Sequence, residues 1–400
     1  MLKDQHIICI SMTFWDAVWL SNHQYMKRLS AQNRVLYVER PVTVVSYLSP
    51  NQREFVSRQL MRWWSDGIRQ VDNNLYVASP PPVLPMRFEK PVNTLNQFIR
   101  GSWIRRVMKK LNFENPILWI YDPDAGRLIG QLGEKLAMYA VTDDHLSMAQ
   151  RSNRITAMRA REKELIANAD LVITTTENLR DTKKQDNPNT HYVPHGIDAD
   201  HFAKAMDAAT QPMPELANLS SPMIGIVGQI NQRIDIPMIT AMATRHPEWN
   251  LIFIGPVVRE RVDVSGLEAL PNVHFLGRKP AEDLPRYLKS ISVCLIPYIV
   301  DEHTTYMHPL KTLEYLAAGK PVVSSPLPAL SIYGDCIRIA GDTDSFIAAV
   351  EDAIATDSPA EQAKRVAYAQ QHTWENRLET ISGLIQQELA KKSSAAAPIK

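Results

Sequence analysis

Short apolar runs alternate with longer segments of helical periodicity along both halves of the chain. The runs are rich in β-branched and aromatic residues and lack a clean in–out alternation, a pattern typical of parallel strands buried on both faces. In the first half they predict strands at 7–11, 35–39, 75–78, 117–121, 136–141 and 171–175. In the second half they predict strands at 223–227, 251–254, 273–275, 293–296, 322–324 and 337–339.

Two strand–helix series of similar size predict an α/β chain with two doubly wound, Rossmann-like domains. The break falls near Val193-Pro194-His195-Gly196, ahead of an Ala- and Pro-rich stretch. We therefore expect an N-terminal domain at 1–195 and a C-terminal domain at 196–372. Apolar residues at helical spacing then predict one amphipathic helix over 373–391, followed by a frayed tail over 393–398.

Composition narrows the class of protein. With 45% hydrophobic and 22% charged residues, the 400-residue chain is globular rather than disordered or fibrous. A net charge of +1 argues against a dedicated nucleic-acid binder. Three distant cysteines favour a reduced, cytoplasmic setting over a disulfide framework or a cysteine zinc site. We find no signal peptide pattern and no apolar stretch of about 20 residues that would span a membrane.

Positive charge gathers between residues 53 and 110, where 11 Lys or Arg face 4 Asp or Glu. The basic residues flank Trp63-Trp64 and surround Trp103: Arg53, Arg58, Arg62, Arg69, Arg100, Arg105, Arg106, Lys109 and Lys110. A cationic, Trp-bearing amphipathic segment can lie on an anionic membrane surface. The alternative is a pair of solvated helices whose apolar side is simply core.

The segment 309–323, PLKTLEYLAAGKPVV, has the strongest local pattern of candidate binding residues. It predicts a helix opened by a proline, ended by a glycine and followed by a buried strand. Lys311 stands in the first turn, where the positive end of the helix dipole already favours an anion, so a phosphate is expected nearby. Glu314 shares its face and could take two vicinal hydroxyls of a ribose. The alternative is a plain surface ion pair between the two side chains.

This stretch resembles the donor-site helix of GT-B fold glycosyltransferases, in particular a bacterial family 4-like branch of surface polysaccharide or teichuronic acid type. Other segments fall in that family's order: Phe14–Trp19 after the first strand, Tyr139–His145, Ala169–Thr175, Val193–Asp198, Gly225–Arg233, Val273–Arg278 and Trp374. The resemblance implies two Rossmann-like domains facing across a cleft. It also implies that the terminal helix packs back onto the first domain.

The resemblance further implies a metal-independent hexosyltransferase without a cofactor. The donor would be a nucleotide-sugar of UDP type, and the acceptor a hydroxyl of a polysaccharide, lipid-linked or other glycan in bacterial cell-surface glycan synthesis. Carried over, Lys311 and Arg233 would contact the diphosphate, Glu314 the ribose, and Tyr298 the base or sugar, unless it is only a rim aromatic. Gly228 opens the donor loop. We expect a cytoplasmic enzyme, peripheral on the inner face of the membrane if residues 53–110 touch it.

The chain departs from the family pattern at one place. Many retaining members carry Glu-x7-Glu, but Tyr306 stands eight residues before Glu314. The loop 303–308 replaces the usual Gly-Phe-Gly. The retaining or inverting outcome is therefore left open.

An inverting transfer needs a base that deprotonates the acceptor hydroxyl. Asp143 and Asp144 follow a predicted strand at the carboxyl edge where α/β sites form, and the resemblance favours Asp144 as the base. The alternative is a pair of solvated or helix-capping carboxylates. Trp15, Asp16 and His23 are weaker acceptor-side candidates, and a structural role is the simpler interpretation of His23.

Other patterns point elsewhere less strongly. Asp122-Pro123-Asp124 has the form of an Asp-x-Asp metal motif but lies far in sequence from the donor motifs, so we expect no metal site. Two alternatives to a transferase remain: a catalytically inactive binding or scaffold protein of the same fold, and a sugar-nucleotide epimerase. The absence of a G-x-G-x-x-G after any predicted strand argues against a dehydrogenase.

Overall fold

The computed structural model describes residues 1–17, 19–43, 45, 53–65, 67–85, 89–142 and 153–396. The chain divides into two compact units, one formed by Met1–Pro194 with Arg377–Lys400 and the other by His195–Asn376. We expected domain boundaries after residues 195 and 372, whereas the two units divide after Pro194 and after Asn376. Each unit is built around its own sheet.

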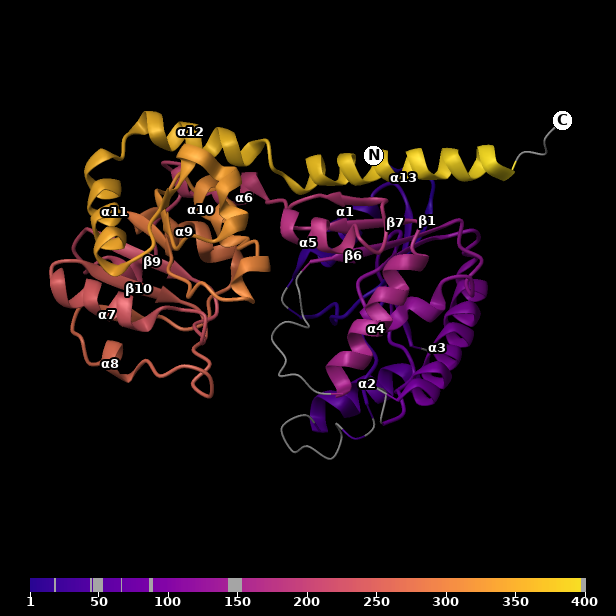
Figure 1. Ribbon diagram of the computed structural model, residues 1–400. Helices are drawn as coiled ribbons and strands as arrows, with labels where there is room; N and C mark the ends of the chain where they lie inside the picture. The colour runs from indigo at the N-terminus through magenta and orange to yellow at the C-terminus, as the bar shows by residue number, and fades with distance from the viewer. Residues whose placement is uncertain are drawn as a thin grey trace. The chain divides into compact units, whose positions relative to one another are not determined.

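Unit 1 holds an eight-stranded sheet in the order β3-β4-β2-β1-β5-β6-β7-β8, in which only the β3–β4 pair is antiparallel. Its strands are β1 (His6–Ile10), β2 (Arg34–Val38), β3 (Ile68–Asp72), β4 (Leu75–Ala78), β5 (Ile117–Ile120), β6 (Leu136–Val141), β7 (Leu171–Thr174) and β8 (Thr190–Tyr192). Its helices include α1 (Ser21–Leu29), α2 (Arg53–Trp64), α3 (Lys90–Leu111), η3 (Pro123–Leu128), α4 (Asn153–Asn168) and α5 (Glu177–Lys183). The central strands are apolar at successive positions because helices cover both faces of the sheet (Figure 1).

The last helix of the chain, α13 (Trp374–Ala396), packs along unit 1 (Figure 1). Leu378, Ile381 and Ile385 are buried, and the backbone N–H of Leu2 donates to Ser382 Oγ at 3.1 Å. The expectation of a frayed tail from residue 393 was wrong. The helix continues to Ala396, where Ala395 and Ala396 are the strongest helix formers and the Ser393 hydroxyl donates to the Leu389 carbonyl, while residues 397 and 398 lie outside the described part of the chain.

Unit 2 holds a six-stranded parallel sheet in the order β11-β10-β9-β12-β13-β14. Its strands are β9 (Met223–Val227), β10 (Asn250–Ile254), β11 (Val273–Phe275), β12 (Val293–Ile296), β13 (Val322–Ser324) and β14 (Arg338–Ile339). Its longer helices are α6 (Ala199–Ala203), α7 (Ile236–Arg245), α9 (Leu284–Ser290), α10 (Lys311–Ala317), α11 (Thr343–Thr356) and α12 (Pro359–Gln370), and short turns include α8 (Ser265–Glu268), η4 (Lys204–Met206), η5 (Pro214–Leu216), η6 (Ala281–Asp283), η7 (Thr304–Tyr306) and η8 (Pro328–Cys336).

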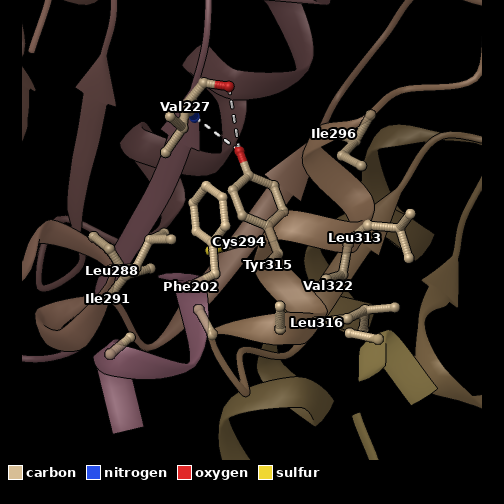
Figure 2. Close-up of a cluster of buried hydrophobic side chains, with 14 of the residues drawn as sticks. Phe202, Val227, Leu288, Ile291, Cys294, Ile296, Leu313, Tyr315, Leu316 and Val322 are labelled. Atoms are coloured by element: carbon tan, nitrogen blue, oxygen red, sulfur yellow. Dashed lines mark hydrogen bonds between the residues drawn. The ribbon is translucent and has the colours of Figure 1, made fainter. Parts of the chain in front are cut away.

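Two apolar cores lie on opposite faces of this sheet. Met223 and Val227 of β9 enter one core, while Ile224 and Ile226 enter the other, as the two-residue period of a strand requires. Figure 2 shows the first core, where residues of α6, α9 and α10 meet strands β9, β12 and β13. Helix α10 is thereby fixed against the sheet by its buried side chains.

All twelve predicted strands occur, and none of their ends is displaced by more than one residue. The α/β class with two Rossmann-like sheets is confirmed. Strands β3 and β8 were not predicted. Both lie at sheet edges, where partly exposed residues replace the apolar run that marks a central strand.

Candidate functional site

The five residues predicted to bind a donor lie at the carboxyl edge of the unit 2 sheet. Gly228 directly follows β9 and Tyr298 follows β12 by two residues, while Lys311 and Glu314 belong to α10. Arg233 lies in the segment after β9, and its carbonyl accepts from the N–H of Ile299 at 2.8 Å. Ligands of open α/β sheets bind at this edge.

Lys311 and Glu314 form an ion pair, with 2.6 Å between Nζ and Oε2. The structure thus contains the i,i+3 ion pair of the alternative interpretation, and the pair is largely buried, since only 10% of the Glu314 side chain and 27% of the Lys311 side chain are exposed. A nearly buried carboxylate loses its hydration and depends on its partner. The Lys311 ammonium keeps two further N–H donors that can meet an anion from solvent.

Glycines with positive φ follow both β9 and β10. Gly228 has φ +134°, and a Cβ placed there would lie 3.7 Å from Lys311 Cε. Gly255 follows β10 with φ +153°, and a Cβ there would meet the Gly228 carbonyl oxygen at 1.8 Å. The two glycines let the ends of β9 and β10 approach and leave space beside the Lys311 side chain.

Arg233 is held by groups on both sides. Its Nε and its backbone N–H both donate to Asn231 Oδ1 at 3.1 Å, and Nη1 lies 3.6 Å from the Met307 sulfur. Its guanidinium carbon lies 5.9 Å from the centre of the Tyr298 ring. Burial raises the pKa of Tyr298, although the positive charges of Arg233 and Lys311 act in the opposite direction. These three residues therefore share one electrostatic environment.

Tyr315 received no role in the sequence analysis, although it ties α10 to the end of β9. Its hydroxyl accepts from the N–H of Val227 at 2.8 Å and lies 3.4 Å from the carbonyl of the same residue (Figure 2). The side chain is 1% exposed. Gly228 is the next residue, so Tyr315 fixes the donor loop relative to Lys311. A tyrosine on the buried face of the motif helix is the sequence signal that could have revealed it.

The arrangement in unit 2 combines two cations, one carboxylate and an open glycine loop. Guanidinium and ammonium groups suit phosphate oxygens, and a fixed carboxylate accepts hydrogen bonds from vicinal hydroxyls. The set matches a nucleoside diphosphate in chemistry. No three His, Cys, Asp or Glu side chains converge on a metal-sized site within the described part of the chain.

The acceptor-side candidates of unit 1 form an aromatic cluster after β1. Trp15 lies 5.4 Å from His23 and 5.0 Å from Tyr37 between ring centres. Both nitrogens of His23 are engaged: Nδ1 faces the N–H of Leu20 at 3.0 Å and Nε2 faces the carbonyl of Phe14 at 3.0 Å. Burial lowers the pKa of His23, which keeps the ring neutral despite that carbonyl. This geometry fits the structural interpretation of His23.

Asp16 is paired with two arginines, Arg62 at 3.0 Å and Arg69 at 2.9 Å. Burial favours the protonated acid, but the hydrogen bonds and charges of Arg69 and Arg62 outweigh it and lower the pKa of Asp16. Glu39, which sequence reasoning missed, is fully buried and accepts from the N–H of Trp15 at 2.9 Å and from Ser79 Oγ at 2.7 Å. Part of the basic excess of 53–110 thus neutralises carboxylates rather than facing solvent.

Asp143 and Asp144 lie outside the described residues. The structure places only what precedes them: β6 ends at Val141, and β5 and β7 flank it in the sheet. Asp122 and Asp124 both have partners within unit 1. Asp122 accepts from Arg100 and from the N–H that opens η3, and Asp124 faces Arg161 Nε at 3.0 Å.

Part of the chain matches a known protein family and one curated relative. Residues 221–356, within unit 2, match the family model described as glycosyl transferases group 1. Over 193 residues the chain is 29% identical to a Bacillus subtilis (strain 168) protein assigned by name to teichuronic acid biosynthesis as a glycosyltransferase (TuaH). The match covers 45% of this chain and 48% of that relative, so the chain spans about half the length of the curated relative it matches.

Solved structures resemble the whole chain. A sucrose-phosphate synthase from Thermosynechococcus elongatus superposes with a TM-score of 0.69 at 17% identity, covering 97% of this chain and 100% of that one. The Escherichia coli trehalose-6-phosphate structure bound with UDP-2-fluoro glucose gives 0.68 at 15% identity, covering 95% and 99%. These likenesses establish the fold. Residues 221–356 thus resemble the glycosyl transferases group 1 family, and the chain as a whole has the GT-B fold.

Proposed function

We propose that the chain is a glycosyltransferase that moves a sugar from a nucleotide-sugar to a hydroxyl of a glycan acceptor. The observation that carries the proposal is the meeting of Arg233, Lys311 and Glu314 beside the Gly228 loop at the carboxyl edge of the unit 2 sheet. Two cations suit a diphosphate leaving group, whose developing charge they would stabilise. Tyr298, packed beside Arg233, would line the base or sugar.

A donor of UDP type is the first choice, because a structure of the same fold binds UDP-2-fluoro glucose. For the acceptor, the partial match to a teichuronic acid glycosyltransferase favours a polysaccharide or lipid-linked glycan of the bacterial surface. Asp144, with Asp143 beside it, is the proposed base because the two carboxylates follow β6 in the sequence within three residues of its end at Val141. Trp15 and Asp16 would border that acceptor side.

Release of nucleoside diphosphate tests the activity. Purified protein is incubated with UDP-sugars, with and without a bacterial surface glycan, and UDP is quantified together with glycan-bound label. A transferase releases UDP only with an acceptor present and labels it. Asp144→Asn should lower transfer roughly 100- to 10,000-fold while leaving donor binding intact. Sugar interconversion without an acceptor would establish the epimerase, and donor binding without any turnover would favour the scaffold protein.

We also propose peripheral contact with an anionic membrane through α2 and α3, at the inner face of the cell membrane. Large apolar side chains are exposed on these helices, with exposed fractions of 83% for Trp64, 62% for Met61 and 59% for Phe98. Arg106 and Lys109 are exposed on the same helix as Phe98. Each cation near such a surface contributes about 1 kcal/mol. None of the helices in the described ranges is long and apolar enough to cross a bilayer.

Cosedimentation with vesicles tests this contact. The protein should pellet with vesicles that contain phosphatidylglycerol, less with pure phosphatidylcholine, and less again after Phe98→Ser. A wild-type protein that stays in the supernatant with both vesicle types would contradict it.

A further inference from the structure

In the first turns of helix α3 in unit 1, polar side chains are buried and large apolar side chains are exposed. Asn93, Gln97 and Arg100 lie four and three residues apart and so share one face, yet they are only 3%, 5% and 2% exposed. The apolar residues of the same turns are on the outside instead, with Leu95 48% and Phe98 59% exposed. A helix that merely covered a core would show the opposite distribution.

The polar atoms on this inner face are incompletely paired. Arg100 Nη1 donates to Asp122 Oδ2 at 2.8 Å, but its Nε and Nη2 have no hydrogen-bond partner among the described residues. The same is true of Asn93 Oδ1 and Gln97 Oε1. Buried polar groups are nearly always satisfied, so a group from outside this part of the chain is expected between them.

These side chains line a small cavity of about 20 Å³ together with Pro41 and Asp122. That volume admits one water-sized group. Amide carbonyls accept hydrogen bonds and the guanidinium donates them, whereas a hydroxyl does both. An anion is a poor match because the Arg100 charge is already balanced by Asp122 and the amide oxygens would repel it.

The cavity lies near the carboxyl ends of the strands of the unit 1 sheet. Asp122 follows β5 by two residues, and β5 stands between β1 and β6. The Trp15 loop follows β1, and the proposed base follows β6, so all three leave the sheet at the same carboxyl edge. A hydroxyl held here would belong to a ligand bound where open α/β sheets bind their ligands.

We propose that this cavity, lined by Asn93, Gln97 and Arg100, is a subsite that receives one hydroxyl of a carbohydrate acceptor. The proposal rests on the proposed transferase function, since it gives the acceptor side of that reaction a named contact. The hydroxyl donates its one hydrogen to Asn93 Oδ1 or to Gln97 Oε1, and the N–H groups at Arg100 Nε and Nη2 donate to its oxygen. Arg100 is oriented for this by its bond to Asp122.

The test uses Gln97→Met and Asn93→Leu, two substitutions that keep size and remove the unpaired carbonyl. Binding of methyl glycosides of glucose, galactose, N-acetylglucosamine and glucuronic acid to the full-length protein is measured by saturation-transfer NMR and titration. Thr94→Ala is the matched control, because Thr94 lies on the exposed face of the same helix and its hydroxyl donates to the Lys90 carbonyl, away from the cavity. Thermal midpoints and UDP binding are recorded on every sample.

We expect at least one glycoside to bind the wild type and the control equally, and to bind at least one of the two cavity variants roughly 5- to 150-fold more weakly, because its hydroxyl loses the carbonyl that accepts from it. The thermal midpoint of the variants should stay level or rise, since an unsatisfied buried acceptor is removed. Unchanged glycoside affinity in both folded variants would overturn the proposal, leaving a cavity for structural water. A wild type that binds UDP but no glycoside would overturn it as well, whereas binding of neither would contradict the transferase function itself.

Discussion

Replacing Tyr315 by phenylalanine removes a single oxygen from the most enclosed contact of the donor region. The Tyr315 hydroxyl bonds to the N–H of Val227 at 2.8 Å, and the ring is 1% exposed, so water has no access to take its place. Leaving a buried N–H without a partner costs about 1–3 kcal/mol. The second contact, at 3.4 Å, adds little.

Amide hydrogen exchange measures this loss at the bond itself. Exchange of the Val227 amide should accelerate roughly 5- to 150-fold, the equivalent of 1–3 kcal/mol, while amides of unit 1 keep their protection. The affinity for UDP should fall too, because Gly228 and Lys311 lose their common anchor. Tyr368→Phe is the control: its hydroxyl donates to the Ile332 carbonyl at 2.9 Å, away from β9. Equal exchange at Val227 in wild type and Tyr315→Phe would refute the positioning role of this hydroxyl.

Three further predictions concern single positions. Burial lowers the pKa of His23 below its unfolded value. The neutral ring therefore contributes its full share to the free energy of unfolding above about pH 6.5, and this share is lost as the pH drops below that value. Urea denaturation of His23→Gln should show a weaker dependence on pH. Gly255→Ala should destabilise unit 2 by about 2–6 kcal/mol in thermal unfolding, because its Cβ would strike backbone at 1.8 Å, whereas Gly266→Ala, with nothing within 4 Å, should be tolerated. Glu39→Gln should lower the free energy of unfolding by about 1–3 kcal/mol, because the backbone N–H of Trp15 and the Ser79 hydroxyl lose a charged acceptor; an unchanged midpoint of urea denaturation would contradict that anchoring.

The sequence predicts the fold well because buried parallel strands leave a direct signature. Runs such as 136–141 and 223–227 are apolar throughout and fall on strands with the same bounds. The edge strand β3 (Ile68–Asp72) has no such signature, since it is partly exposed and pairs antiparallel with β4. Its pairing depends on tertiary contacts that a local pattern does not contain.

The sequence likewise predicts some residues of the candidate sites and misses others. The helix motif identifies Lys311 and Glu314, because the spacing of three residues fixes their common face. The sequence did not predict the contacts of Tyr315 and Glu39, because their partners, Val227 and Trp15, lie 88 and 24 residues away along the chain. Buried polar contacts of that range arise from the packing of strands and helices.

The central claim is that unit 2 binds a nucleoside diphosphate through Lys311 and Glu314. Isothermal titration of UDP, GDP, ADP and TDP against the wild type, Lys311→Met and Lys364→Met tests it most directly. Lys364 pairs with Glu361 at the same three-residue spacing on exposed helix surface, which makes it a matched control. We predict that one nucleotide binds the wild type and Lys364→Met alike, and binds Lys311→Met roughly 10- to 150-fold more weakly. Equal affinity of Lys311→Met, or no binding of any nucleotide to the wild type, would contradict the account.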